Sequence, residues 1–173
     1  MNHAETTGYP VITLGGVPIP PEAGAPDQSM EPLFGATVVR MSDGAGVKLT
    51  HWDGKLSGTL TGSGLVPVGL DALDYRSSLE MQAIQPISIA QDSPAFTLPK
   101  APRTDKEPWA LALVEGRWVP TPCVRAGLVV TVTERPAATL YMVQFMPRFN
   151  VFADPPSTSM NAAHGWTLNW QEV

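Results

Sequence analysis

Few side chains in this sequence could carry acid–base or metal chemistry. The only histidines are His3, His51 and His164, and none has a carboxylate, a cysteine or a second histidine at metal-ligand spacing. His51 is followed by Trp52 and Asp53, and such an aspartate could orient an imidazole as a general base. A half-buried strand histidine beside a turn aspartate is the commoner arrangement, so a small hydrolase that uses His51 is a remote alternative. The sequence predicts no metal site.

The candidate nucleophiles lack the surroundings that would activate them. Ser63 lies in the run Gly62-Ser63-Gly64, without the strand-turn-helix context of a nucleophilic serine. Cys123 is the one cysteine, and Arg125 nearby could lower the pKa of its thiol, but no base is identifiable beside it. The glycine clusters lie between expected strands rather than before helices, which argues against phosphate-binding and dinucleotide-binding loops. The sequence therefore predicts no catalytic residue and no cofactor-binding residue.

Two further groups of residues suggest binding rather than catalysis. Asp71 and Asp74 are close in sequence, and Asp43 and Asp53 lie in separate expected turns, but no run has the regular oxygen ligands of a calcium loop. Five tryptophans could form a sugar-stacking surface, although tryptophans on strands are usually core or interface anchors. They are Trp52, Trp109, Trp118, Trp166 and Trp170.

The composition is typical of a turn-rich β protein. Of 173 residues, 43% are hydrophobic and 16% charged, with 15 glycines and 18 prolines. A formal net charge of −5 argues against a general nucleic-acid binder. A single cysteine excludes an intrachain disulfide and indicates a reducing compartment during folding. The N-terminus has neither a basic region nor an apolar run, so we expect no secretion signal and no membrane span.

The strands expected to organise the fold are residues 128–133 and 139–145. Both are rich in β-branched and aromatic residues, and Glu134-Arg135-Pro136-Ala137 between them predicts a short turn, so we expect an antiparallel core hairpin. Val130 and Val132 share one face of the first strand, while Tyr141, Val143 and Phe145 share one face of the second.

Further hairpins are expected on both sides of these strands. Gly15-Gly16 and Glu115-Gly116 predict two-residue turns, and Pro18 places the second arm of the first hairpin on a sheet edge. Residues 36–41 and 47–52 flank a glycine-rich turn, and Asp53-Gly54 predicts another turn into a third strand. Terminal residues 166–171 alternate as a closing strand.

Three other segments lack a clear strand pattern. Residues 20–32 are proline-rich, and are either an extended arm or linker, or a long surface loop of the same domain. Residues 70–75 form the one convincing helical turn. Residues 99–108 form the most charged run and have no apolar anchor, which favours a solvated loop over a partner-contact loop.

Several runs resemble a small family of virion structural proteins from tailed bacteriophages. They are residues 38–48, 62–75, 107–114 and 165–168, so the similarity covers the chain from Val38 to its C-terminus. The opening hairpin at Gly15-Gly16 also resembles the start of other phage tail proteins. The resemblance implies a tail or baseplate component, with no catalytic residues to carry over.

The sequence therefore predicts an all-β, antiparallel β-sandwich or barrel-like domain with an extended proline-rich N-terminal segment. Residues 1–32 would form the N-terminal hairpin and proline-rich arm, and residues 33–173 the β domain. With the resemblance, the expected function is that of a non-enzymatic structural subunit of a phage tail tube, distal tail or baseplate adaptor. We expect it in the virion tail after assembly in the host cytoplasm, as a homo-oligomeric ring in contact with other tail or baseplate proteins. The alternative is a carbohydrate- or receptor-binding β-sandwich module.

Overall fold

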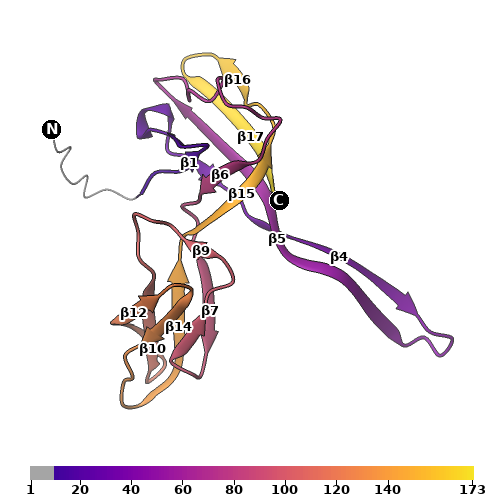
Figure 1. Ribbon diagram of the computed structural model, residues 1–173, viewed down its shortest axis with the longest axis vertical. Coiled ribbons are helices and arrows are strands. Elements are labelled where there is room, and N and C mark those ends of the chain that lie inside the picture. Colours follow the sequence, from indigo (N-terminus) through magenta and orange to yellow (C-terminus); the bar gives the residue numbers. More distant parts are fainter. Residues whose placement is uncertain (1–9) are drawn as a thin grey trace. The chain divides into compact units, whose positions relative to one another are not determined.

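The computed structural model describes residues 10–173, and almost every element in them is a β-strand (Figure 1). One short 3-10 turn, η1 (Pro21–Ala23), is the single helical element of the described residues. The first nine residues, with His3, lie outside them. The predicted all-β, antiparallel fold class is confirmed.

The strands in chain order are β1 (Thr13–Leu14), β2 (Val17–Pro18), β3 (Asp27–Gln28), β4 (Glu31–Arg40), β5 (Gly46–Gly64), β6 (Leu79–Gln82), β7 (Ile87–Gln91), β8 (Ala95–Thr97), β9 (Ala101–Pro102), β10 (Trp109–Val114), β11 (Arg117–Thr121), β12 (Cys123–Ala126), β13 (Val129–Val132), β14 (Ala138–Phe145), β15 (Pro147–Ala153), β16 (Ser157–Met160) and β17 (His164–Glu172).

The strands belong to two compact units, each built from two separate stretches of the chain. The first unit contains the described residues up to Pro21 together with Glu80–Phe149, and the second contains Glu22–Leu79 together with Asn150–Val173. The units do not divide where the sequence suggested, between residues 32 and 33. The reason is strand pairing: β1 pairs with β6 in the first unit, whereas β3 and β4 pair with β5 in the second.

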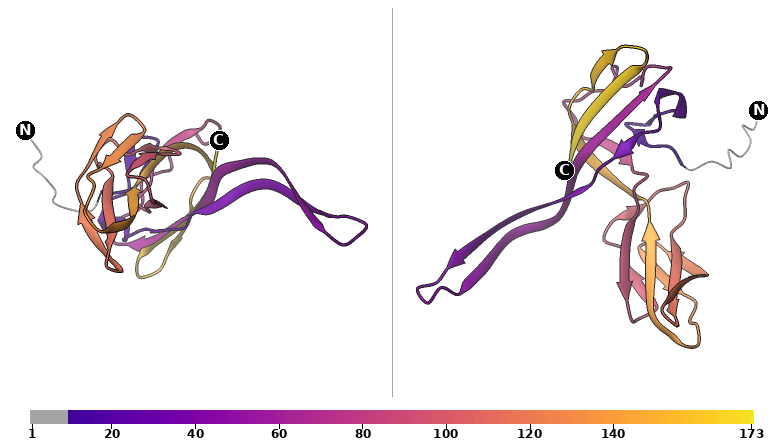
Figure 2. Two further views of the ribbon diagram at one scale, coloured as in Figure 1. Left: turned by 90° about the horizontal axis from the view of Figure 1, so that it is seen from below. Right: turned by 180° about the vertical axis from the view of Figure 1, so that it is seen from behind.

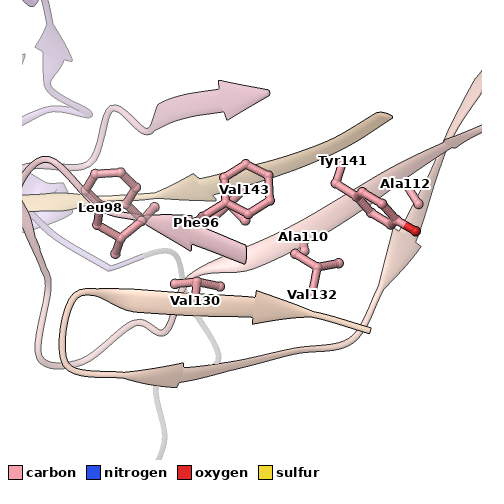
Figure 3. Close-up of a cluster of buried hydrophobic side chains, with 9 residues drawn as sticks. Phe96, Leu98, Ala110, Ala112, Val130, Val132, Tyr141 and Val143 are labelled. Carbon is pink, nitrogen blue, oxygen red and sulfur yellow. The ribbon is translucent and has the colours of Figure 1, made fainter. Parts of the chain in front are cut away.

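A β-sandwich forms the centre of the first unit. One sheet has the order β11-β10-β14-β7 and the other β12-β13-β8. Alternate residues of each strand point inward, and Figure 3 shows side chains of the two sheets facing one another. The buried cluster is Phe96, Leu98, Ala110, Ala112, Val130, Val132, Tyr141, Val143 and Phe145.

The prediction of a core hairpin is wrong about which strands pair, but it is right about which side chains of each strand point into the core. β13 pairs with β12 and β8, while β14 pairs with β10 and β7, so the two strands lie in opposite sheets. The connection crosses from sheet to sheet through Pro136 and Ala137, where Ala137 adopts a φ of 64°. Val130 and Tyr141 nevertheless belong to one core, because each strand turns its predicted face inward.

The second unit is organised around β5, a strand of 19 residues. β4 and β3 pair with one edge of β5, and β17 pairs with the other edge over residues 57–64. β16 and the last residues of β15 pair with β17. Trp166 and Trp170 of β17 are buried, and the Trp166 indole Nε1 donates a hydrogen bond to the Ala23 carbonyl at 2.9 Å.

Several local predictions are corrected in the second unit. Asp53-Gly54 is not a turn, because β5 continues through both residues. Gly54 adopts a positive φ of 77° within the strand. Residues 20–32 form η1, β3 and the start of β4, and they pack along β5. Residues 70–77 form two tight turns rather than a helix, with hydrogen bonds from Leu73 N to Leu70 O and from Ser77 N to Asp74 O.

The predicted two-residue turns are confirmed. Gly15 and Gly16 have φ values of 57° and 81°, and Glu115 and Gly116 have values of 49° and 77°. Positive φ at both central positions is the requirement of the turn type that matches strand twist. Pro18 lies on β2, at the outer end of its sheet, as predicted.

Candidate functional site

The hairpin of β4 and β5 extends away from the other strands of the second unit (Figures 1 and 2). We call residues 35–55 the long hairpin. Every residue from 37 to 55 is exposed, so no described residue of the second unit covers either side of this ribbon. Two strands alone are marginally stable in water, and a long exposed ribbon is a template for contact with another chain.

The register of the long hairpin separates its side chains onto two faces. Thr37 lies opposite Leu49 and Val39 opposite Val47, and residues directly opposite one another share a face. Trp52 pairs with Gly35, and its indole lies so close to the Gly35 Cα that a Cβ there would overlap it.

We call Thr37, Val39, Val47, Leu49 and Trp52 the uncharged face of the long hairpin. Leu49 is 47% exposed and Trp52 is 51% exposed.

The opposite face of the long hairpin is basic. Val38 pairs with Lys48, and the Lys48 ammonium lies 4.9 Å from the centre of the Phe34 ring, a cation–π contact. Arg40 lies at the end of this face, and its Nη1 donates to the Gly44 carbonyl at 3.1 Å. This hydrogen bond and the one from Ala45 N to the Asp43 carboxylate, at 3.0 Å, hold the turn at the tip.

The base of the long hairpin is attached to the C-terminal residues. Leu56 N donates to a Glu172 carboxylate oxygen at 2.9 Å, and Lys55 Nζ donates to the Val173 carbonyl at 2.6 Å. Two register shifts, on either side of Gly35, put extra residues into β5 and bend the ribbon.

A second uncharged surface lies in the first unit, on the outward side of the sheet β11-β10-β14-β7. Ala110 and Ala112 point into the core, so the residues that alternate with them point outward. Pairing places Leu111 beside Met142 and Leu113 beside Leu140 and Trp118. The outer sheet face consists of Trp109, Leu111, Leu113, Trp118, Leu140 and Met142.

These side chains are only partly covered by one another. Trp118 is 38% exposed and the others are half-buried. Trp109 Nε1 donates to the Gln144 side chain at 2.7 Å, which fixes the indole, and Lys106 lies at the rim, 5.7 Å from the centre of the Trp109 ring. Antiparallel strands normally have one apolar and one wet face, so apolar residues on both faces indicate a second buried contact.

The structure brings the candidate catalytic residues into no working arrangement. His51 is exposed on the long hairpin. Asp71, Ser159 and His164 line one hollow of about 350 Å³, yet no hydrogen bond joins these three side chains in the described part of the chain. Ser63 lies within β5, not on a turn before a helix. No group of three or more histidines, cysteines or acidic residues in residues 10–173 could hold a metal ion.

Cys123 is not activated by Arg125. Arg125 forms a bidentate ion pair with Glu107, at 2.7 and 2.8 Å, so its charge is already paired. Burial raises the pKa of the Cys123 thiol, and the negative charge of Glu107 raises it further. The suggestion that Arg125 lowers the pKa of this thiol is therefore wrong, and the thiol is a poor nucleophile at neutral pH.

The tryptophans do not form one surface. Trp166 and Trp170 are buried in the second unit, and Trp52 lies on the long hairpin of the same unit. Trp109 and Trp118 lie on the outer sheet face of the first unit.

The charged run of residues 99–108 is anchored, contrary to prediction. The Arg103 side chain is 1% exposed, and its Nε and Nη2 donate to the Asp105 carboxylate at 2.7 and 2.8 Å. Its Nη1 donates to the carbonyls of Gln82 and Ala83, each at 3.1 Å. The hydrogen bond from Arg103 holds the pKa of the Asp105 carboxyl below its usual value. The arrangement fastens the loop to the end of β6.

A polar groove of about 550 Å³ is hollowed into the second unit. Tyr75, Phe152 and Trp170 line it together with Asp154 and Asn169. Phe152 is 52% exposed, whereas Trp170 is 2% exposed.

Sequence reasoning missed the long hairpin and the outer sheet face as surfaces. A signal was present in both, because apolar residues occupy successive positions at Val38-Val39 and along Trp109–Val114. No helix among the described residues has the length and apolar character needed to cross a membrane. The chain matches no protein-family model, no curated protein and no solved structure.

Proposed function

We propose that the chain is a non-enzymatic structural subunit of a bacteriophage tail, which assembles into a ring with copies of itself and contacts other tail or baseplate proteins. The long hairpin is the observation that carries this proposal. It holds apolar residues on both faces, and its residues 37–55 are all exposed. The resemblance to virion structural proteins supports the place in a phage tail.

The energy of one hairpin contact favours a closed assembly. Fully burying a large apolar side chain contributes about 1.5–3 kcal/mol, so covering four that are already half-buried contributes about 4 kcal/mol. The four are Val39, Val47, Leu49 and Trp52. Before the entropy cost of association, this corresponds to a dissociation constant of about 1 mM. A ring in which each copy makes two such contacts would be much more stable.

The mass of the purified protein in solution tests the proposal, followed by electron microscopy of any ring. Light scattering across a wide concentration range should show a concentration-dependent oligomer of defined size. A variant with residues 38–48 replaced by Asn-Gly joins the register partners Thr37 and Leu49 by a two-residue turn. We expect this variant to fold and to remain monomeric. A monomeric full-length chain at every concentration would contradict the proposal.

A carbohydrate-binding module is the second candidate, and the polar groove favours it. Aromatic residues beside Asp154 and Asn169 are the usual elements of sugar recognition. This function predicts saturable binding on a glycan array that Phe152→Ala removes without changing oligomeric state. Absence of glycan binding by a folded full-length chain would reject it.

A further inference from the structure

We propose that the uncharged face of the long hairpin of one copy packs on the outer sheet face of a second copy. The inference rests on the proposed function, because it names the contact through which the subunits assemble. Both surfaces of the proposed contact are formed by residues of this chain.

Polarity is the first argument for this pairing. The chain carries 11 basic and 16 acidic residues, yet the residues that form these two surfaces are all uncharged. The outward neighbours of the outer sheet face on β7 are Ser88 and Ala90, which are uncharged as well. Burying the two surfaces against one another would therefore leave charges in water apart from Lys106 at the rim of the outer sheet face, and desolvated charge is the main cost of a poorly matched interface.

Shape is the second argument. Sheets pack face to face at about 10 Å with their strands roughly aligned. β10 has six residues, and the outer part of β4 from Gly35 to Arg40 is of equal length, so each is about 20 Å long at a rise of about 3.3 Å per residue. A two-stranded ribbon thus matches the length of the sheet on which it would lie.

The other exposed sheet face of the first unit is a weaker acceptor. The outward residues of β12, β13 and β8 include Val124, Thr131 and Thr97, which are small and β-branched. The outer sheet face instead presents leucines, a methionine and two tryptophans, and large aromatic anchors dominate interface energies.

The topology of the contact follows from its two different surfaces. Each copy would donate one hairpin and accept another, so the contact is heterologous and generates a ring or a filament rather than a two-fold dimer.

Complementation between two assembly-defective variants tests the contact. The hairpin variant is Val39→Glu/Leu49→Glu, and the acceptor variant is Met142→Lys. Ala90→Lys is a second acceptor variant, because Ala90 is exposed and lies opposite Met142, so its substitution leaves the core intact. The controls are Thr50→Glu, on the basic face, and Thr131→Lys, on the other sheet.

We expect each defective variant alone to associate at least tenfold more weakly than the wild type, while both controls associate normally. A mixture of the hairpin variant and an acceptor variant should form a 1:1 heterodimer and nothing larger, because one intact contact remains. To trap this weak complex, the Met142→Lys variant, whose hairpin is intact, carries the photo-cross-linking residue p-benzoylphenylalanine at position 52 in place of Trp52. Mass spectrometry should then locate the cross-links in β10 or β14 of the hairpin variant.

Three results would overturn the inference. Normal assembly of both acceptor variants, or cross-links that avoid β10 and β14, would show that the hairpin binds elsewhere. Self-association of the acceptor variants, together with the absence of any complex between them and the hairpin variant, would indicate symmetric hairpin–hairpin pairing. In these cases the proposed self-assembly survives, whereas a wild-type chain that never associates would remove the proposed function as well.

Discussion

Replacing Arg103 by methionine should destabilise the first unit strongly although the residue lies in a charged loop. The guanidinium is buried and donates to four acceptor atoms: two oxygens of Asp105 and the carbonyls of Gln82 and Ala83. Methionine fills a similar volume without any donor, so the substitution isolates the loss of the hydrogen bonds.

The two carbonyls determine the magnitude. A buried acceptor left without its donor costs about 1–3 kcal/mol. Ala83 is buried and Gln82 is half-buried, so the two together give a loss of about 3 kcal/mol in the free energy of unfolding. The Asp105 ion pair adds little to this sum, because the Asp105 side chain is 52% exposed.

Hydrogen exchange measured by mass spectrometry is the appropriate assay, since it reports each unit separately. Protection of β10 and β14 amides should fall by the equivalent of about 3 kcal/mol. Arg117→Met is the matched control, because Arg117 is exposed on β11 of the same unit, and it should change protection by less than about 0.5 kcal/mol. A loss below about 1 kcal/mol for Arg103→Met, or one equal to the control, would refute the reasoning.

Three further outcomes are expected. Gly64→Ala should lower the unfolding free energy by about 2 kcal/mol in thermal melts, because its Cβ would overlap the backbone around Ala23, whereas Gly46→Ala, which meets no atom closer than 3.6 Å, should be nearly neutral. The ionised Asp105 carboxylate should contribute its full stabilisation above the usual carboxyl pKa and lose it as the pH falls through the lowered pKa of the folded protein. Asp105→Asn should therefore make the free energy of unfolding less dependent on pH below about pH 4. Cys123 should react with iodoacetamide more slowly at pH 7.5 than a cysteine in an unstructured peptide, because its pKa is raised; equal rates would contradict this.

Local features of the fold were predictable from the sequence because they depend on neighbouring residues. Gly15-Gly16 and Glu115-Gly116 specify their turns through backbone conformation alone. Alternation likewise identified the inward faces of β13 and β14. The pairing of those two strands was not predictable, because alternation is the same whether a strand meets its successor within one sheet or faces it across a sandwich.

The surfaces of the candidate site were harder to predict than the strands that carry them. Apolar alternation in Val47 and Leu49 predicts burial, and no local signal says that these two side chains are exposed. Arg103 shows the opposite error: a charged run indicates solvent, but this guanidinium meets carbonyls of a strand about 20 residues earlier. Both cases depend on partners distant in sequence.

The distribution of apolar residues fits an assembled state better than an isolated chain. In β10 the inward-pointing alanines are buried in the sandwich core. The leucines that alternate with them point outward, and they are larger apolar side chains than the buried alanines. The long hairpin likewise places Val39, Leu49 and Trp52 on a ribbon that no other described strand of the second unit covers. Strands that are apolar on both faces are normally buried on both faces. The first unit covers one face of β10 and β14 and leaves the other partly exposed, while both faces of the long hairpin are exposed. Under the proposed assembly, a second copy would supply the missing layer to the outer sheet face and to the uncharged face of the long hairpin.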